Sequence, residues 1–177
     1  MRSASRLILV PLLLFTAALA CLAAPGMGSA ADDKEHGPGI AVFDFNYLDT
    51  SGEERDQRSD HKARLREFMT ALKHDLVAKG QFGLIVPTCT PDPCDRERAD
   101  QTELIEAART AGANFLVIGG IHKMSTLVQW ARVEAIDIST GQIALDKLFT
   151  FRGDTDEAWR RAEAFIADEI ASIPRSE

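Results

Sequence analysis

Apolar and polar positions follow each other in blocks along the chain, and these blocks predict a succession of strands. Three runs are apolar almost throughout and short, which is typical of buried strands. In two later segments, apolar and polar residues alternate. These segments are separated by Ser139-Thr140-Gly141-Gln142, where Gly141 suits the positive φ of a hairpin turn. The predicted strands cover 40–45, 82–86, 115–121, 127–138 and 143–151.

Helices are predicted where apolar residues recur three and four positions apart, as in Leu65, Phe68, Met69 and Leu72. The predicted helices cover 60–79, 101–111 and 154–172. The element order is therefore β-α-β-α-β-β-β-α. This order predicts an α/β fold, a single-domain sandwich with a mixed sheet of about five strands. Residues 46–60 are expected to be a polar loop.

The first residues have the pattern of a secretory signal. Arg2 and Arg6 precede an apolar run over 7–20, and a small-residue cleavage site lies near residue 31. We therefore expect a signal peptide over 1–31, a polar leader over 32–38 and one domain over 39–174. This apolar run is the only one of membrane length, so no transmembrane span is expected after its removal.

Export predicts a periplasmic protein. Cys21 offers an alternative, because Leu19-Ala20-Cys21 partly matches a lipoprotein signal in which the cysteine carries the lipid. Ala18 stands where leucine is usual in such signals, and a second small-residue site follows. Soluble export is the preferred interpretation, and lipidation of Cys21 is the alternative.

The charge balance narrows the classes of partner. The full chain has a formal charge of −7, and loss of Arg2 and Arg6 leaves 18 basic and 27 acidic residues, a charge of −9. Nucleic acid needs cationic groups for its phosphates, so it is excluded as a partner. An anionic membrane surface is disfavoured for the same reason.

Two cysteines in an oxidising compartment predict a disulfide between Cys89 and Cys94. Pro91 and Pro93 lie between them, so the segment is neither helix nor strand. Closing so short a loop stabilises the fold by about 2 kcal/mol in the chain-entropy model. A redox role is the alternative, although reactive thiols usually occur in a Cys-x-x-Cys pattern.

Polar residues at strand ends predict a ligand pocket as one possibility. Asp44 follows the first strand, and His122 and Lys123 follow the central one, which is where α/β folds often bind ligands. No phosphate-binding loop, nucleophile–base pattern or zinc ligand spacing accompanies them. We therefore expect no catalytic residue, cofactor or metal. The carboxylates of Asp49 and Glu53 are expected to be solvated.

Trp130 is the first candidate for a partner surface. It shares one face of its predicted strand with Arg132 and Glu134, because alternate residues of a strand point the same way. Large aromatic and arginine side chains dominate binding energy at protein interfaces. Trp130 and Arg132 therefore mark a contact surface if no helix covers that face of the sheet.

The start of the last helix is the second candidate. Asp154 is expected to cap the helix with Glu157 three residues later, as in a capping box. Helix capping and core packing account for the start of this helix without any role in binding. The functional alternative is a partner contact through Trp159, Arg160 and Arg161.

Four segments together resemble a family of small exported bacterial proteins known only as a domain of unknown function. The most specific of them is Thr-Asp-Glu-x-Trp-Arg-Arg, within the last segment. Family members often carry a close cysteine pair where Cys89 and Cys94 occur here, and the wider spacing in this chain is a departure. The segments that carry the resemblance are 40–45, 112–120, 122–127 and 153–161.

The element order and the turn at 137–142 are also similar, more loosely, to the N-terminal domain of the Tol–Pal component TolB and to the curli-secretion lipoprotein family. This resemblance implies a non-catalytic module that binds an envelope protein, and fold similarity alone identifies no site. A periplasmic protein that binds a small ligand is the alternative function. A thiol–disulfide redox protein is the second alternative.

Overall fold

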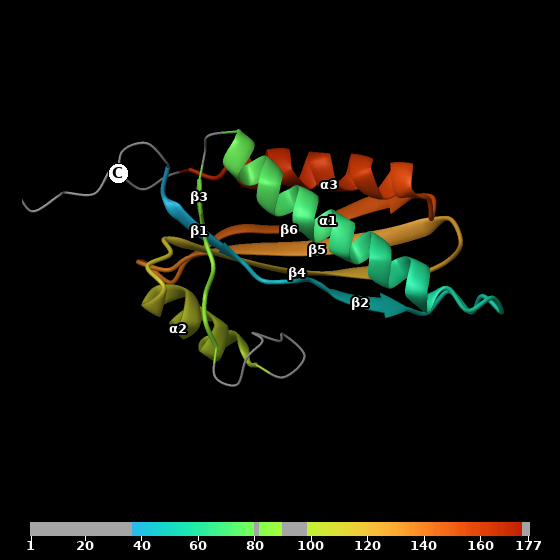
Figure 1. Cartoon of the computed structure of the whole chain (residues 1–177), viewed down its shortest axis with the longest axis horizontal. Coiled ribbons are helices and arrows are strands. Elements are labelled where there is room, and N and C mark those ends of the chain that lie inside the picture. Colours follow the sequence, from blue (N-terminus) through green and yellow to red (C-terminus); the bar gives the residue numbers. More distant parts are fainter. Residues whose placement is uncertain (1–36, 80–81, 90–98, 175–177) are drawn as a thin grey trace, which may run out of the picture. The chain divides into compact units, whose positions relative to one another are not determined.

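The computed structural model describes residues 37–79, 82–89 and 99–174, which form three helices and six strands (Figure 1). In chain order they are β1 (Gly39–Val42), β2 (Asn46–Asp49), α1 (Arg58–Ala78), β3 (Gly83–Ile85), α2 (Gln101–Thr110), β4 (Phe115–Lys123), β5 (Val128–Asp137), β6 (Ile143–Arg152) and α3 (Asp156–Ala171). The predicted α/β class and mixed sheet are confirmed. None of these helices is both long and apolar enough to cross a membrane.

The strands form one sheet in the order β3-β1-β4-β5-β6. β1 pairs in parallel with β3 and β4, whereas β4, β5 and β6 form an antiparallel meander. β2 also pairs in parallel with β4, so β1 and β2 lie one after the other along the same strand. Ile40 is level with Phe115, and Asn46 is level with Gly120.

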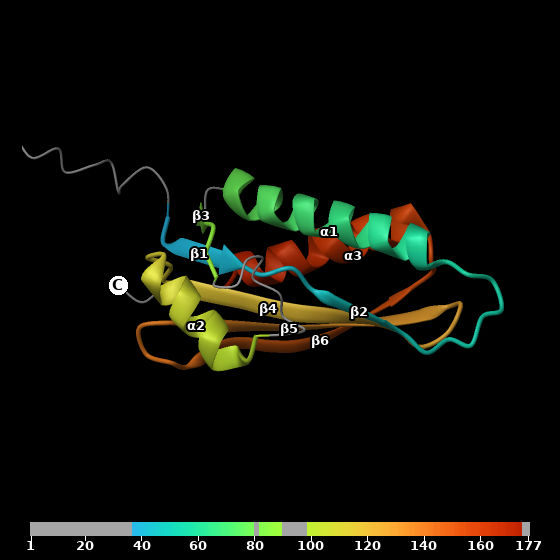
Figure 2. The ribbon, with the colours of Figure 1, turned by 60° about the horizontal axis from the view of Figure 1, so that its bottom comes forward.

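Helices lie on both faces of the sheet. α1 and α3 pack side by side on one face and α2 packs on the other, as Figure 2 shows. The larger core lies under α1 and α3, where Leu72 and Ile166 are fully buried. A smaller core lies under α2, where Leu104 contacts the sheet around Leu116. Because helices cover both faces of β4 along part of its length, that strand is apolar almost throughout.

The predicted loop over 46–60 is wrong in part, because it contains β2 and the first turn of α1. In β2 only Tyr47 packs against the core, while Asn46, Leu48 and Asp49 are exposed. A strand of four residues with one inward side chain has no apolar run that would identify it. This additional strand raises the sheet from the expected five strands to six.

Two glycines in β4 allow the chain between β1 and β2 to lie directly on the sheet. A Cβ atom at Gly119 would clash with the ring of Phe45, and one at Gly120 would clash with the side chain of Asn46. Glycine in a strand interior often marks such a close approach of another segment. The pair therefore positions β2 beside the end of β4.

Candidate functional site

Half of one sheet face has no helix over it among the described residues. α2 covers the part of this face around Leu116, Ile118 and Ile136. Figure 2 shows no helix below the part of the sheet that contains β2. Strand alternation aims five side chains outward from this uncovered half, which we call the open face. The open face consists of Leu48, His122, Trp130, Arg132 and Leu148.

The register of the sheet brings these side chains together. Leu48 is level with His122, and His122 is level with Trp130, so the three form a row across β2, β4 and β5. Arg132 is level with Leu148 in the next row, on β5 and β6. Side chains that are level on neighbouring strands are in contact range. The open face is therefore one continuous patch built from four strands.

Trp130 is held in place at the centre of this patch. Its ring meets the ring of His122 edge to face, with centroids 6.1 Å apart and an angle of 90°. The His122 Nε2 atom is 2.7 Å from Thr50 Oγ1, which fixes the imidazole. The Trp130 residue is 36% exposed. A large aromatic side chain is thus pre-positioned and accessible to solvent.

The rest of the open face mixes apolar and charged groups. Leu48 is 54% exposed and Leu148 is 53% exposed, both high values for leucine. The guanidinium of Arg132 donates to Asp146 at 2.9 Å and to Glu134 at 3.4 Å. Aromatic and arginine side chains beside exposed leucines are typical of the centre of a protein interface, with polar groups at its rim.

A shallow hollow of about 240 Å³ lies within the open face. Gly120 and the side chain of Asn46, which lies over this glycine, line it. Leu48, His122 and Arg132 stand around it. The hollow can accept a side chain from another molecule, in the way that pockets at interfaces accept anchor residues.

The expected pocket of Asp44, His122 and Lys123 does not form. His122 and Lys123 are neighbours on β4 and point to opposite faces of the sheet, because strand side chains alternate. Asp44 is exposed and its carboxylate is 2.6 Å from Lys73 Nζ on α1. The structure places only His122 on the open face, beside Trp130.

The expected partner surface is divided in the same way. Trp130 and Arg132 lie together on the open face, whereas Arg160 and Arg161 lie on α3, on the other side of the sheet. Both α3 arginines are exposed and pair with Glu157. Trp159 is 2% exposed and packs in the core, as the packing interpretation expects, and the alternative of a partner contact through it is wrong. Its position follows the apolar stripe of α3.

A buried ion-pair network lies at the end of the sheet where α1 and α3 begin. Lys123 is fully buried, and its Nζ donates to Asp154 at 2.8 Å and to Glu53 at 2.7 Å. His61 is 2% exposed, and its Nε2 donates to Asp154 at 2.8 Å. Arg64 also donates to Asp154 at 2.8 Å. Asp154 is therefore the common partner of three basic side chains, which we call the Asp154 network.

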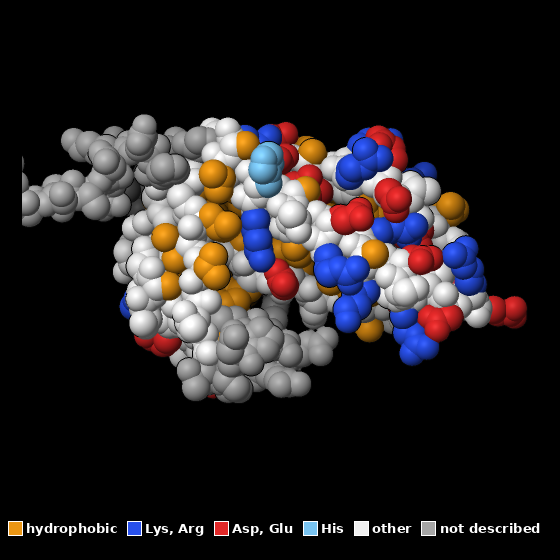
Figure 3. All heavy atoms as spheres, viewed as in Figure 1, with side chains coloured by type: hydrophobic (Ala, Val, Ile, Leu, Met, Phe, Trp, Pro, Cys, Tyr) orange, Lys and Arg blue, Asp and Glu red, His pale blue; other side chains and the backbone are white. Residues whose placement is uncertain are grey.

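In the Asp154 network, hydrogen bonds between opposite charges outweigh the effect of burial on Asp154 and Lys123. Burial alone would raise the pKa of Asp154, but hydrogen bonds from His61 and Lys123 outweigh it and lower this pKa to about 2. Burial would lower the pKa of Lys123, and its hydrogen bonds to Asp154 and Glu53 outweigh that effect and raise it. Figure 3 shows the adjoining surface, where side chains of both charges are mixed.

Sequence reasoning missed this network. Asp154 does not cap α3; Thr155 does, by accepting from the Ala158 backbone N–H. Glu53 and Asp49 are not simply solvated, since Glu53 binds Lys123 and Asp49 lies 3.7 Å from His61. The alternation of β4 places Lys123 on the same face as Val117 and Ile121, but it does not indicate which face the helices α1 and α3 cover. In residues 37–79, 82–89 and 99–174 no group of three or more potential ligands could hold a metal ion.

The cysteine prediction is tested at one residue only. Cys89 takes part in a disulfide bond and packs at the edge of the core under α2. Cys94 lies outside the described residues, so its pairing with Cys89 stays a prediction. The signal peptide, the polar leader and Cys21 also lie outside them.

Comparisons with known proteins agree with this fold. A family model, DUF3280, described as a protein of unknown function (DUF2380), matches residues 38–170. The resemblance to a family of unknown function is thereby confirmed, while the Thr-Asp-Glu-x-Trp-Arg-Arg motif stays a prediction as its signature. A comparison with curated protein sequences finds no match.

Two solved structures have a similar fold, and a third matches with a TM-score below 0.5. CT253, a hypothetical protein from Chlamydia trachomatis, is 13% identical with a TM-score of 0.52, over 77% of this chain and 97% of that chain. The PelC dodecamer from Paraburkholderia phytofirmans is 16% identical with a TM-score of 0.50, over 80% of this chain and 90% of that chain. TolB from Acinetobacter baumannii is 16% identical with a TM-score of 0.44, over 76% of this chain and 27% of that chain. At these identities the similarity concerns the fold alone.

Proposed function

The chain belongs to the DUF3280 family of proteins of unknown function, and we propose that it is a non-catalytic module that binds another protein of the bacterial cell envelope. The open face is the proposed binding surface. Its partner is an envelope protein whose exposed apolar side chains complement Trp130, Leu48 and Leu148.

The observation that carries this proposal is the exposure of Trp130 on a part of the sheet that no described helix covers. Exposed leucines on both sides extend the apolar area across four strands. Large exposed apolar patches with polar rims mark interaction sites in soluble domains. Trp130 touches His122 and is not needed to fill the core, so its packing alone does not explain it.

The envelope location is proposed from the sequence. Residues 1–31 have the order of a secretory signal, and the cysteines suit an oxidising compartment. The disulfide at Cys89 agrees with this compartment. We propose a periplasmic protein after removal of the signal, with lipidation at Cys21 as the alternative.

Affinity capture from envelope extracts tests the proposal. The chain carries a C-terminal tag, and retained proteins are quantified by mass spectrometry. We expect one envelope protein whose recovery falls by about tenfold or more in Trp130→Ser, because loss of a central aromatic anchor weakens binding by 2 kcal/mol or more. Arg160→Ser is the matched control, since Arg160 is exposed on α3. Equal recovery with all three proteins would contradict the proposal.

A further inference from the structure

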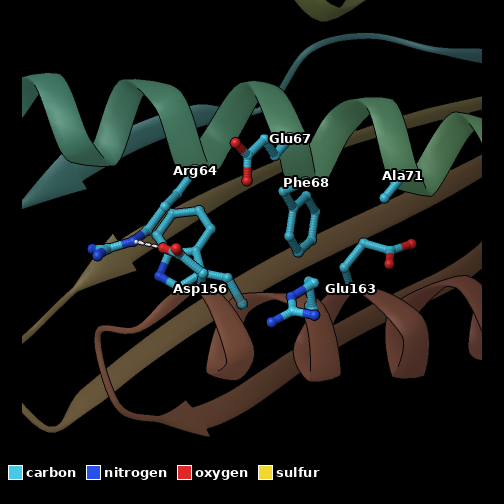
Figure 4. A pocket seen from close by; sticks show the side chains of 8 residues that line it. Arg64, Glu67, Phe68, Ala71, Asp156 and Glu163 are labelled. Atoms are coloured by element: carbon cyan, nitrogen blue, oxygen red, sulfur yellow. Dashed lines mark hydrogen bonds and ion pairs between the residues drawn. The ribbon is translucent and has the colours of Figure 1, made fainter.

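A groove lies between α1 and α3, on the opposite side of the sheet from Trp130. It has a volume of about 130 Å³ and opens to solvent. Figure 4 shows Phe68 between the two helices, with Glu67 projecting from α1 and Glu163 from α3. Ala71 lines the groove as well, and its small side chain leaves the space unfilled.

Glu163 is an unusual residue in this groove. It is 4% exposed, and its Oε1 has no hydrogen-bond partner in the part of the chain that the structure describes. Burial, followed by the nearby negative charge of Asp75, raises the pKa of Glu163 to about 7. A buried polar atom without a partner is rare in folded proteins and calls for an explanation. The explanation we favour is a bound group that the chain itself does not supply.

The unpaired charge of the groove is negative. Arg64 is bound to Asp156 and Asp154, and Arg160 is bound to Glu157. Neither Glu67 nor Glu163 has a hydrogen bond or ion pair among the described residues. Both arginines that line the groove are thus paired, while the two glutamates have no such partner; Lys79 acts on Glu163 but is itself bound to Asp168. A cation bound at Glu163 would balance its charge, and the nearby carboxylate of Glu67 would add to the attraction.

The walls of the groove suit an organic cation better than a metal ion. The ring of Phe68 meets the ring of Trp159 edge to face, with centroids 6.1 Å apart and an angle of 89°. Both rings belong to the core and line the inner wall of the groove, where Phe68 is 3% and Trp159 2% exposed. Cations bind favourably at aromatic rings, and the attraction grows when water is excluded. A hard metal ion, in contrast, needs several oxygen ligands, and only two unpaired carboxylates are present here.

We propose that the groove between α1 and α3 binds a small organic cation, a protonated amine or a guanidinium. Glu163 binds its charged group, the exposed Glu67 adds negative charge at the edge of the groove, and Phe68 and Trp159 pack against its carbon atoms. This site is separate from the open face and does not depend on the function proposed for it.

The two tryptophans make the test specific, because each indole N–H gives its own NMR signal. The protein is produced from the full coding sequence with ¹⁵N label and purified in the form the cell makes. It is titrated at about pH 8 with n-butylammonium chloride, with 1-butanol and sodium chloride as separate controls. With n-butylammonium we expect a saturable shift of the Trp159 indole signal and no shift of the Trp130 signal. With 1-butanol or sodium chloride we expect neither signal to shift.

Variants of Glu163 and Glu67 test whether these two carboxylates bind the cation. Glu163→Gln keeps the shape and removes the charge, and we expect the midpoint of the titration to rise by about tenfold or more. Glu67→Gln removes an exposed carboxylate and should also raise the midpoint of the titration. Glu106→Gln is the control, because Glu106 pairs with Arg109 on α2, on the other face of the sheet, and this variant should leave the midpoint unchanged. An unsaturable shift, an equal effect of 1-butanol, or a midpoint unchanged in Glu163→Gln would overturn the proposal.

Discussion

Replacement of Asp154 by asparagine tests the ion-pair network at its common partner. The side chain of Asp154 is 11% exposed and contacts Lys123, His61 and Arg64, each at 2.8 Å. Asparagine has nearly the same shape but no charge. The variant would leave the buried ammonium of Lys123 with Glu53 as its remaining anionic partner. Breaking a buried ion pair from one side is strongly destabilising.

The pKa of Asp154 gives the size of the stability loss expected in Asp154→Asn. Its ordinary value of 3.8 is lowered to about 2 in the folded protein. This difference corresponds to about 2 kcal/mol of folding free energy from the ionised carboxylate. We therefore expect Asp154→Asn to lower the free energy of unfolding by about 2–3 kcal/mol at neutral pH, at the lower end of the range for buried pairs.

The pH dependence distinguishes charge from shape. Asp154 ionises more easily in the folded protein, so its stabilising effect is complete above its ordinary pKa and is lost as the pH falls through about 2. The difference between wild type and Asp154→Asn should be constant at neutral pH and should shrink below about pH 4. Urea unfolding followed by tryptophan fluorescence measures it.

Asp156→Asn is the matched control for this experiment. Asp156 binds Arg64 at 2.8 Å, but its side chain is 69% exposed. Exposed ion pairs contribute about 1 kcal/mol or less. If the two variants lose the same stability at neutral pH, or if the Asp154→Asn difference does not change with pH, the reasoning about the network is refuted.

Three further predictions concern other parts of the fold. The pKa of Glu163 rises from 4.5 to about 7 on folding, so wild-type stability should fall as the pH rises through this range. The total fall should be about 3 kcal/mol, and Glu163→Gln should remove most of it in urea unfolding at about pH 5 and pH 8; parallel curves would contradict this prediction. Thr155→Ala should destabilise α3 by about 1 kcal/mol in thermal unfolding, because Thr155 accepts from Ala158 N–H, whereas Thr155→Ser should match wild type. Cys89→Ser should lower the free energy of unfolding by about 2 kcal/mol and leave partner capture unchanged; an intact fold without function would instead favour the redox alternative.

The sequence predicted those elements that have a repeated apolar pattern. The stripe of Phe68, Met69, Leu72 and Leu76 in α1 is buried as expected. The hairpin between β5 and β6 forms around Gly141, whose φ is 69°. In each case local spacing fixes which side faces the core, so no knowledge of distant residues is needed.

The candidate site depended on information that local pattern does not contain. Because β4 is apolar on both faces, its sequence did not indicate on which side His122 and Lys123 would point; pairing with β5 decides this. Lys123 is charged and was expected near a pocket, yet it is buried. Its burial requires Asp154 and Glu53, which lie 31 and 70 residues away along the chain. Such partners appear only when the chain is folded.

Photo-crosslinking in cells tests the open face as a binding surface most directly. A benzoylphenylalanine side chain replaces Leu148, which is 53% exposed beside Trp130 and Arg132, and in a second protein it replaces Arg161 on α3. We predict a discrete adduct with one envelope protein from position 148 and none from position 161. Adding Trp130→Ser should reduce that adduct by about tenfold or more. An adduct from position 161 alone, or one from position 148 that Trp130→Ser leaves undiminished, would contradict the account.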